Sequence, residues 1–205
     1  WGEPILEGHA DTMAAKIEEV RKFMIGRDPL KIEDTWQAIY RNGCYRGGPI
    51  LMSAISGIDM ALWDIKGKYL NAPVHALFGG PVRDRVRSYR WIGGDRPNGL
   101  IEGAKEVMAE GYDAVKFNIC EELQIVDTYA KIDGIIKKLF ELREAVGDKL
   151  DLAFDFHGRV HVPMAKILLK ELEPLRPIFV EDAVVSAQVD AMADLAKSTS
   201  IPLTI

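Results

Sequence analysis

The chain is organised around residues 150–160, LDLAFDFHGRV, where a short apolar run ends in an aspartate and a histidine follows two positions later. If the run is a strand, its two-residue period places Asp155 and His157 on one face and Phe154 and Phe156 on the other. An aspartate can hold a hard cation and an imidazole can move a proton near neutral pH, so the pair is a candidate half of an active site. At a strand end the same residue types also form turns and caps, and this window alone leaves both interpretations open.

Short apolar strands alternate with helical segments on both sides of this stretch. Strands are predicted at residues 86–92, 114–117, 150–154, 178–180 and 203–205, with helices near 100–110, 126–146, 164–172 and 187–198. This alternation is typical of a parallel sheet, and its spacing predicts a (β/α)₈-type barrel with active groups at the C-terminal ends of the strands. A doubly wound sheet normally carries a glycine fingerprint after its first strand, which WIGGD at 91–95 does not match.

The first part of the chain has a different character. Helices are predicted at residues 10–25, 31–41 and 50–69, with a short helical turn at 73–77. Small residues along the third helix indicate close packing against another element. The glycine-rich loop at 43–49 lacks the spacing of a phosphate-binding motif, so a structural role is favoured. The Gly-Gly-Pro break at 79–81 then marks a boundary between a domain at 1–84 and one at 85–205.

Composition narrows the class of protein. The 205 residues carry a net charge of −5, with 48% hydrophobic and 28% charged residues, which is typical of a soluble globular protein. No apolar run is long enough to span a bilayer, and no secretory leader precedes the first helix, so we expect a cytoplasmic protein without a membrane partner. Mild acidity argues against nucleic-acid binding. The widely separated Cys44 and Cys120 have no metal-ligand or redox spacing and fit a reducing compartment.

The two ends of the chain suggest a longer protein. The sequence opens on Trp1 without an initiator methionine and stops at Ile205, within a predicted strand. We therefore expect that both domains are incomplete here and that the barrel part holds about five strands.

The predicted strand ends bring charged groups together. Lys116 and Asn118 end the second strand, Asp155 the third and Glu181 the fourth. Two carboxylates at neighbouring strand ends could share a divalent cation, and oxygen ligands favour Mg²⁺, Mn²⁺ or Ca²⁺ over softer metals. An internal ion pair between Lys116 and one of the acids would satisfy the same charges, so both interpretations stay open.

Four stretches carry a resemblance to a known family. They are YRGGPILMSA at 45–54, ALWDIKGK at 61–68, WIGGDRP at 91–97 and DFHGRVH at 155–161. The chain resembles the enolase superfamily in its mandelate racemase subgroup, and most of all the sugar-acid dehydratases called D-galactonate dehydratases. The resemblance implies an α/β protein in which an α+β capping domain, here without its first strands, precedes a (β/α)₈-type barrel.

The resemblance also assigns roles. It implies that Asp155 and Glu181 are ligands of one Mg²⁺ ion, with Mn²⁺ as an alternative, and that His157 is the general acid that protonates the departing 3-hydroxyl. Lys116 would add positive charge near the substrate carboxylate, and Asn118 would bind substrate where some relatives carry a second lysine. The third acidic ligand and a histidine base are expected after residue 205.

The resemblance further implies a lyase that converts D-galactonate to 2-dehydro-3-deoxy-D-galactonate through an enediolate, and it suggests a homo-oligomer. Two alternatives stay open. One is a dehydratase of a different acid sugar. The other is a non-catalytic fragment or degenerate homologue with a binding or assembly role, because Glu181-Asp182-Ala183 departs from the Glu-Glu-Pro that family members usually carry.

Overall fold

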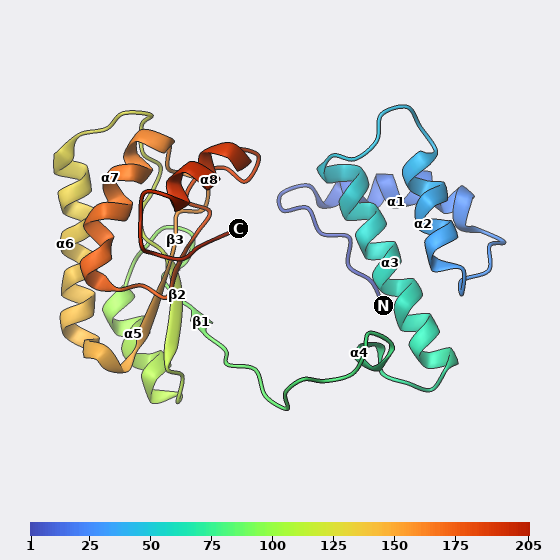
Figure 1. The fold of residues 1–205 in the computed structure, drawn as a ribbon, viewed down its shortest axis with the longest axis horizontal. Coiled ribbons are helices and arrows are strands. Elements are labelled where there is room, and N and C mark those ends of the chain that lie inside the picture. Colours follow the sequence, from blue (N-terminus) through green and yellow to red (C-terminus); the bar gives the residue numbers. More distant parts are fainter. The chain divides into compact units, whose positions relative to one another are not determined.

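The computed structural model describes residues 1–205, which divide into two compact units, residues 1–85 and 86–205 (Figure 1). The first unit is helical and contains no strand. Its helices are α1 (Ala10–Met24), α2 (Ile32–Arg41), α3 (Pro49–Tyr69) and the short α4 (Val74–Leu77). No helix in either unit is long and apolar enough to cross a membrane.

The first unit is held by apolar residues from its three long helices. Val20, Ile39 and Ile55 are buried against one another, one from each helix. The small residues of α3 serve a close approach, because a Cβ placed on Gly57 would lie only 2.5 Å from the nitrogen of Pro4. Glycine at this position therefore lets the N-terminal segment lie across α3.

The second unit alternates strands and helices. Its strands are β1 (Arg90–Trp91), β2 (Ala114–Asn118), β3 (Asp151–Asp155), β4 (Phe179–Glu181) and β5 (Leu203–Thr204). Its helices are α5 (Leu100–Ala109), α6 (Tyr129–Val146), α7 (Val162–Leu172) and α8 (Val189–Ala196), with 3₁₀ turns at Gly147–Lys149 and Glu173–Leu175. All neighbouring strands are parallel and stand in chain order, as in a partial (β/α)₈ barrel, which confirms the predicted fold class.

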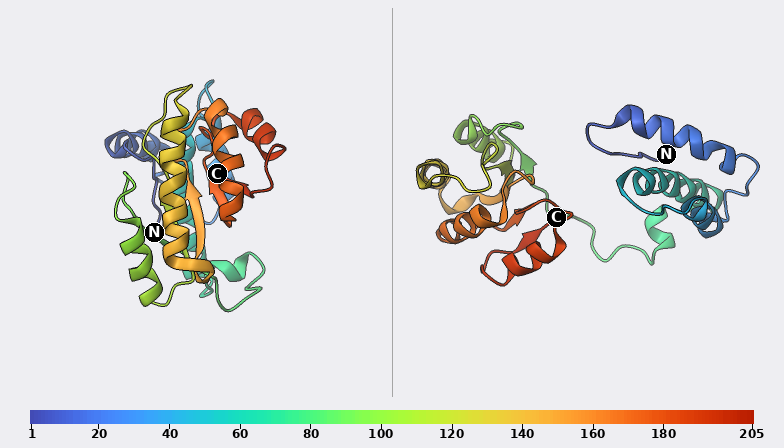
Figure 2. Two further views of the ribbon diagram at one scale, coloured as in Figure 1. Left: turned by 90° about the vertical axis from the view of Figure 1, so that its left-hand side faces the viewer. Right: turned by 90° about the horizontal axis from the view of Figure 1, so that it is seen from above.

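Alternating side chains divide the sheet into two faces. Phe117 and Phe154 belong to the core that the sheet shares with its helices, and their rings meet edge to face at 5.5 Å. The helices form an outer arc beside the strands (Figure 2). Lys116 and Asp155 are neighbours of these phenylalanines in sequence and so point to the opposite face, where charged groups are gathered.

The first strand is much shorter than predicted. The sequence indicated a strand over residues 86–92, but only Arg90 and Trp91 pair, with Val115 and Lys116 of β2. In this register Tyr89 would lie opposite Ala114, the first residue of β2, so residues 86–88 lie before the start of β2 and have no partner there. The helix predicted from residue 126 likewise begins only at Tyr129, after the capping side chain of Thr128 accepts a hydrogen bond from the backbone of Lys131.

Candidate active site at the carboxyl edge of the sheet

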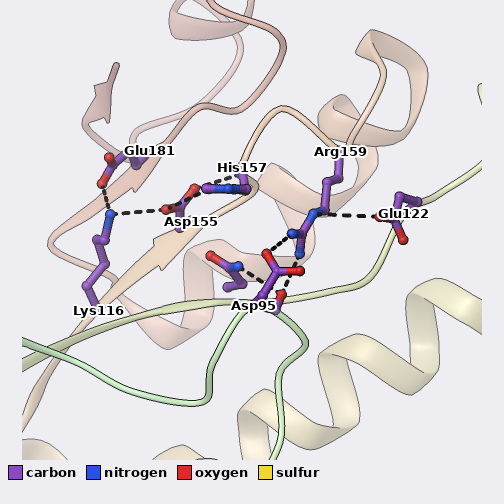
Figure 3. A network of polar contacts seen from close by, with 8 residues as sticks. Asp95, Lys116, Glu122, Asp155, His157, Arg159 and Glu181 are labelled. Carbon is purple, nitrogen blue, oxygen red and sulfur yellow. Dashed lines mark hydrogen bonds and ion pairs between the residues drawn. The ribbon is translucent and has the colours of Figure 1, made fainter. Parts of the chain in front are cut away.

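The register of the sheet brings three predicted site residues into contact. Asp155 lies opposite Glu181 on β4, and Lys116 reaches both from β2. The Lys116 Nζ donates to Asp155 Oδ2 at 3.0 Å and to Glu181 Oε2 at 2.7 Å (Figure 3). Only 14% of the Lys116 side chain and 4% of the Asp155 side chain are exposed. The internal ion pair of Lys116, which was one of the two interpretations of the sequence, is therefore present. It includes both Asp155 and Glu181.

These contacts set the charge of the lysine. Burial by itself would lower the pKa of Lys116, but the hydrogen bonds that the ammonium donates to Glu181 and Asp155, together with their negative charges, outweigh burial. The pKa of Lys116 is raised above its ordinary value, and the ammonium stays charged at neutral pH. The Lys116 ammonium is thus held between the carboxylates of Asp155 and Glu181.

The predicted strand geometry of His157 is wrong. Strand β3 ends at Asp155, and His157 lies in the following turn with a left-handed φ of 52°. The turn forms because the His157 N–H donates to Asp155 Oδ1 at 2.6 Å, which competes with continued strand pairing. The imidazole still lies near the acid, with Nδ1 3.6 Å from Asp155 Oδ2, and 40% of the side chain is exposed. A group outside the turn can therefore reach it.

A second turn follows the next strand. Asp182 also has a left-handed φ, 45°, and its carbonyl accepts a hydrogen bond from the Gly158 N–H at 3.3 Å. Burial raises the pKa of the Asp182 carboxyl, and the nearby charges of Asp155 and Glu181 raise it further. The edge of the sheet therefore concentrates negative charge around Lys116.

Asn118 occupies the end of β2, opposite Asp155. Its Nδ2 donates to the backbone oxygen of Asp95 at 3.0 Å, while its Oδ1 is buried and no donor contacts it. A buried amide oxygen without a donor is costly, so this atom is an unfavourable feature at the end of β2.

Two residues of this network were not predicted to belong to it. Arg159, in the turn after β3, donates from Nη1 to the Asp95 backbone oxygen at 2.6 Å and pairs with the Asp95 carboxylate through Nη2 (Figure 3). The Arg159 guanidinium lowers the pKa of Asp95. In the sequence, both residues follow strand ends and lie in two of the stretches that carry the family resemblance, WIGGDRP and DFHGRVH.

The donors present fit a hard divalent cation in part. Asp155 and Glu181 offer carboxylate oxygens on adjacent strand ends, which is the chemistry that Mg²⁺ or Mn²⁺ selects. Across residues 1–205, no group of three or more His, Cys, Asp or Glu side chains is arranged to hold a metal. These two acids could therefore supply two ligands, but the residues present do not form a complete metal site.

Comparisons with known proteins show the family of the chain. Residues 1–79 match the family model of the mandelate racemase / muconate lactonizing enzyme N-terminal domain, and residues 99–205 match the enolase C-terminal domain-like model. The chain is 52% identical over 203 residues to a D-galactonate dehydratase of Ralstonia pickettii (strain 12J), covering 99% of this chain and 53% of that protein. It thus spans about half the length of this curated relative.

Solved structures give the same picture. A crystal structure of an enolase from Pantoea ananatis with bound D-gluconate and Mg superimposes with a TM-score of 0.84 at 28% identity, covering 98% of this chain and 57% of that one. A mandelate racemase/muconate lactonizing enzyme-like protein from Rubrobacter xylanophilus gives a TM-score of 0.83 at 25% identity, over 95% and 56%.

Proposed function

Because the chain belongs to the mandelate racemase / muconate lactonizing enzyme family of the enolase superfamily, we propose that the whole protein is a metal-dependent sugar-acid dehydratase. The proposed reaction converts D-galactonate to 2-dehydro-3-deoxy-D-galactonate. The observation that carries it is the grouping of Lys116, Asp155, Glu181 and His157 at one edge of the sheet. The domain roles belong to the same proposal, with residues 1–84 as the capping domain and 85–205 as the barrel, in a cytoplasmic homo-oligomer.

Asp155 and Glu181 would hold the cation, Mg²⁺ in the first instance. When bound, that cation neutralises negative charge on the substrate carboxylate as the neighbouring carbon loses its proton. Lys116 contributes a second positive charge that is fixed before substrate arrives, because both acids hold its Nζ within 3.0 Å. A preorganised charge of this kind lowers the barrier without rearrangement during the reaction.

His157 is proposed to give a proton to the departing 3-hydroxyl. Its side chain is 40% exposed, so substrate can reach it, and its Nδ1 lies 3.6 Å from Asp155 Oδ2. Asn118 is proposed to bind substrate, since it ends β2 opposite Asp155 at the same edge of the sheet. The base and a third acidic ligand are proposed to lie elsewhere in the whole protein, and because this chain covers only 53% of the D-galactonate dehydratase that it matches, the test uses the whole gene product.

The test is incubation of the whole protein with D-galactonate and Mg²⁺, followed by measurement of the keto acid formed. We expect His157→Asn to lower kcat by about 10²–10⁴-fold, the usual contribution of a general acid. His161→Asn is the matched control, because His161 is an exposed histidine in the same loop. It should leave kcat unchanged.

D-Gluconate serves as the second substrate, since the Pantoea ananatis structure similar to this chain contains it with Mg. Turnover of gluconate but not galactonate would replace the substrate and keep the reaction class. The proposal would be overturned if neither substrate gave keto acid, or if the wild type and His157→Asn had equal turnover. Either result would favour a binding or assembly role.

A further inference from the structure

We propose that Arg159 is a positioning residue: it fastens the loop after β1 to the turn that carries His157, and so fixes the direction of that imidazole. The inference rests on the proposed function for its catalytic consequence. Its structural part, the fastening of two loops by one guanidinium, stands on the contacts of Arg159 alone.

The guanidinium joins segments that are far apart in sequence. Arg159 and Asp95 are separated by 64 positions, yet Arg159 binds both the backbone oxygen and the carboxylate of Asp95. Only 11% of the Arg159 side chain is exposed. A forked, largely buried arginine holds geometry better than a single surface ion pair, because two donors fix its plane.

The Asp95 carbonyl also contacts the end of a third strand, β2. Asn118 Nδ2 donates to the Asp95 backbone oxygen at 3.0 Å, while Arg159 Nη1 donates to it at 2.6 Å. The Asp95 backbone oxygen therefore accepts one hydrogen bond from the end of β2 and one from the turn that follows β3. The loop after β1 contains Gly93, Gly94 and Gly99, all with positive φ, and has little stiffness of its own. These two donors hold Asp95, while Arg96 in the same loop donates to Glu122 Oε1 at 2.7 Å.

His157 has no equivalent anchor for its ring. Its Nδ1 is 3.6 Å from Asp155 Oδ2, which is too long for a hydrogen bond. The orientation of the imidazole is therefore set by the backbone of the turn, in which His157 adopts a left-handed φ. Arg159 closes that turn, since its N–H donates to the Phe156 carbonyl at 2.9 Å. A guanidinium fixed to Asp95 two positions beyond His157 thus restrains the backbone that aims the imidazole.

The test compares Arg159→Gln and Arg159→Lys with Arg87→Gln in the whole protein. Arg87 is the matched control because it also bridges to acids from two segments, but at the opposite edge of the sheet. In Arg159→Gln we expect hydrogen exchange to speed up about tenfold in residues 93–99 and 156–161. We expect kcat to fall about 10–100-fold with KM nearly unchanged. Arg159→Lys, which keeps the charge but lacks the fork, should fall between Arg159→Gln and the wild type.

A measurement that needs no activity is the rate at which diethyl pyrocarbonate modifies His157, with His75, an exposed histidine of the first unit, as internal reference. That rate should change in Arg159→Gln and stay at the wild-type value in Arg87→Gln. Unchanged exchange in both loops, or faster exchange with unchanged kcat and unchanged modification of His157, would overturn the positioning role. If the wild type dehydrates no acid sugar, the proposed function fails, and exchange and modification still decide the role of Arg159.

Discussion

The two edges of the sheet carry nearly the same arrangement of charges. At the carboxyl edge, Lys116 joins Asp155 and Glu181 at 3.0 and 2.7 Å. At the amino edge, Arg87 joins two acids in the same way.

The amino-edge contacts are equally short. Arg87 Nε lies 3.0 Å from Asp113 Oδ1, and Nη2 lies 2.6 Å from Asp151 Oδ2. The difference is solvent: 53% of the Arg87 side chain is exposed, against 14% of Lys116. A buried charge depends on its partners while an exposed one is screened by water, so the same pattern of charges has unequal consequences. Geometry alone would not separate a candidate active site from a surface ion pair.

The largest effect is expected from Lys116→Met. This change leaves Asp155 buried beside Glu181 with no positive charge, so we expect the free energy of unfolding to fall by about 2–4 kcal/mol. Urea denaturation at pH 7 in the presence of EDTA measures it. Excess Mg²⁺ should reduce the deficit, since a divalent cation would neutralise the same carboxylates. A loss below about 1 kcal/mol would erase the distinction between the two edges.

Lys116→Arg tests whether the buried site accepts any cation. A guanidinium is larger and planar, and the space between the two acids is fitted to an ammonium, so overpacking should destabilise the protein by about 1–3 kcal/mol. The measurement is the same urea titration, with Arg87→Lys as the control at the exposed edge. Wild-type stability for Lys116→Arg would show that charge alone, without shape, satisfies the site.

Much of this architecture could be predicted from the sequence. Alternating strands and helices indicate a parallel sheet, and parallel strands end at a common edge, so Lys116, Asp155 and Glu181 were expected to meet. The shortness of the first strand could not be predicted. Alternation in residues 86–92 does not indicate how many of these residues pair with the neighbouring strand.

The rest depends on contacts that no periodicity encodes. The left-handed turn at His157 arises when a side-chain oxygen of Asp155 takes its N–H, and a two-residue strand pattern cannot register that competition. The Arg159–Asp95 contact joins two loops 64 positions apart, and each residue alone resembles an ordinary surface charge. Strand ends are thus predictable as a set, whereas the loops that connect them are not.

Arg87→Met should have a much smaller effect than the same change at Lys116. Exposed ion pairs contribute little, so we expect a loss of about 0–1 kcal/mol in the free energy of unfolding. The measurement is urea denaturation under the conditions used for Lys116→Met. A loss equal to that of Lys116→Met would show that exposure does not distinguish the two arrangements.

The smallest expected effect is that of salt on the stability changes caused by Arg87→Met and Lys116→Met. Salt should act differently on the exposed charges of the amino edge and the buried charges of the carboxyl edge. Raising NaCl from 0.05 to about 0.5 M shortens the screening length to only a few ångströms, which weakens interactions between exposed charges and leaves buried ones nearly intact. The stability difference between wild type and Arg87→Met should therefore shrink by a few tenths of a kcal/mol. The difference between wild type and Lys116→Met should stay constant, because solvent ions barely reach Asp155. If both differences shrink equally, the carboxyl edge is as open to solvent ions as the amino edge, and the argument for a protected charge site there fails.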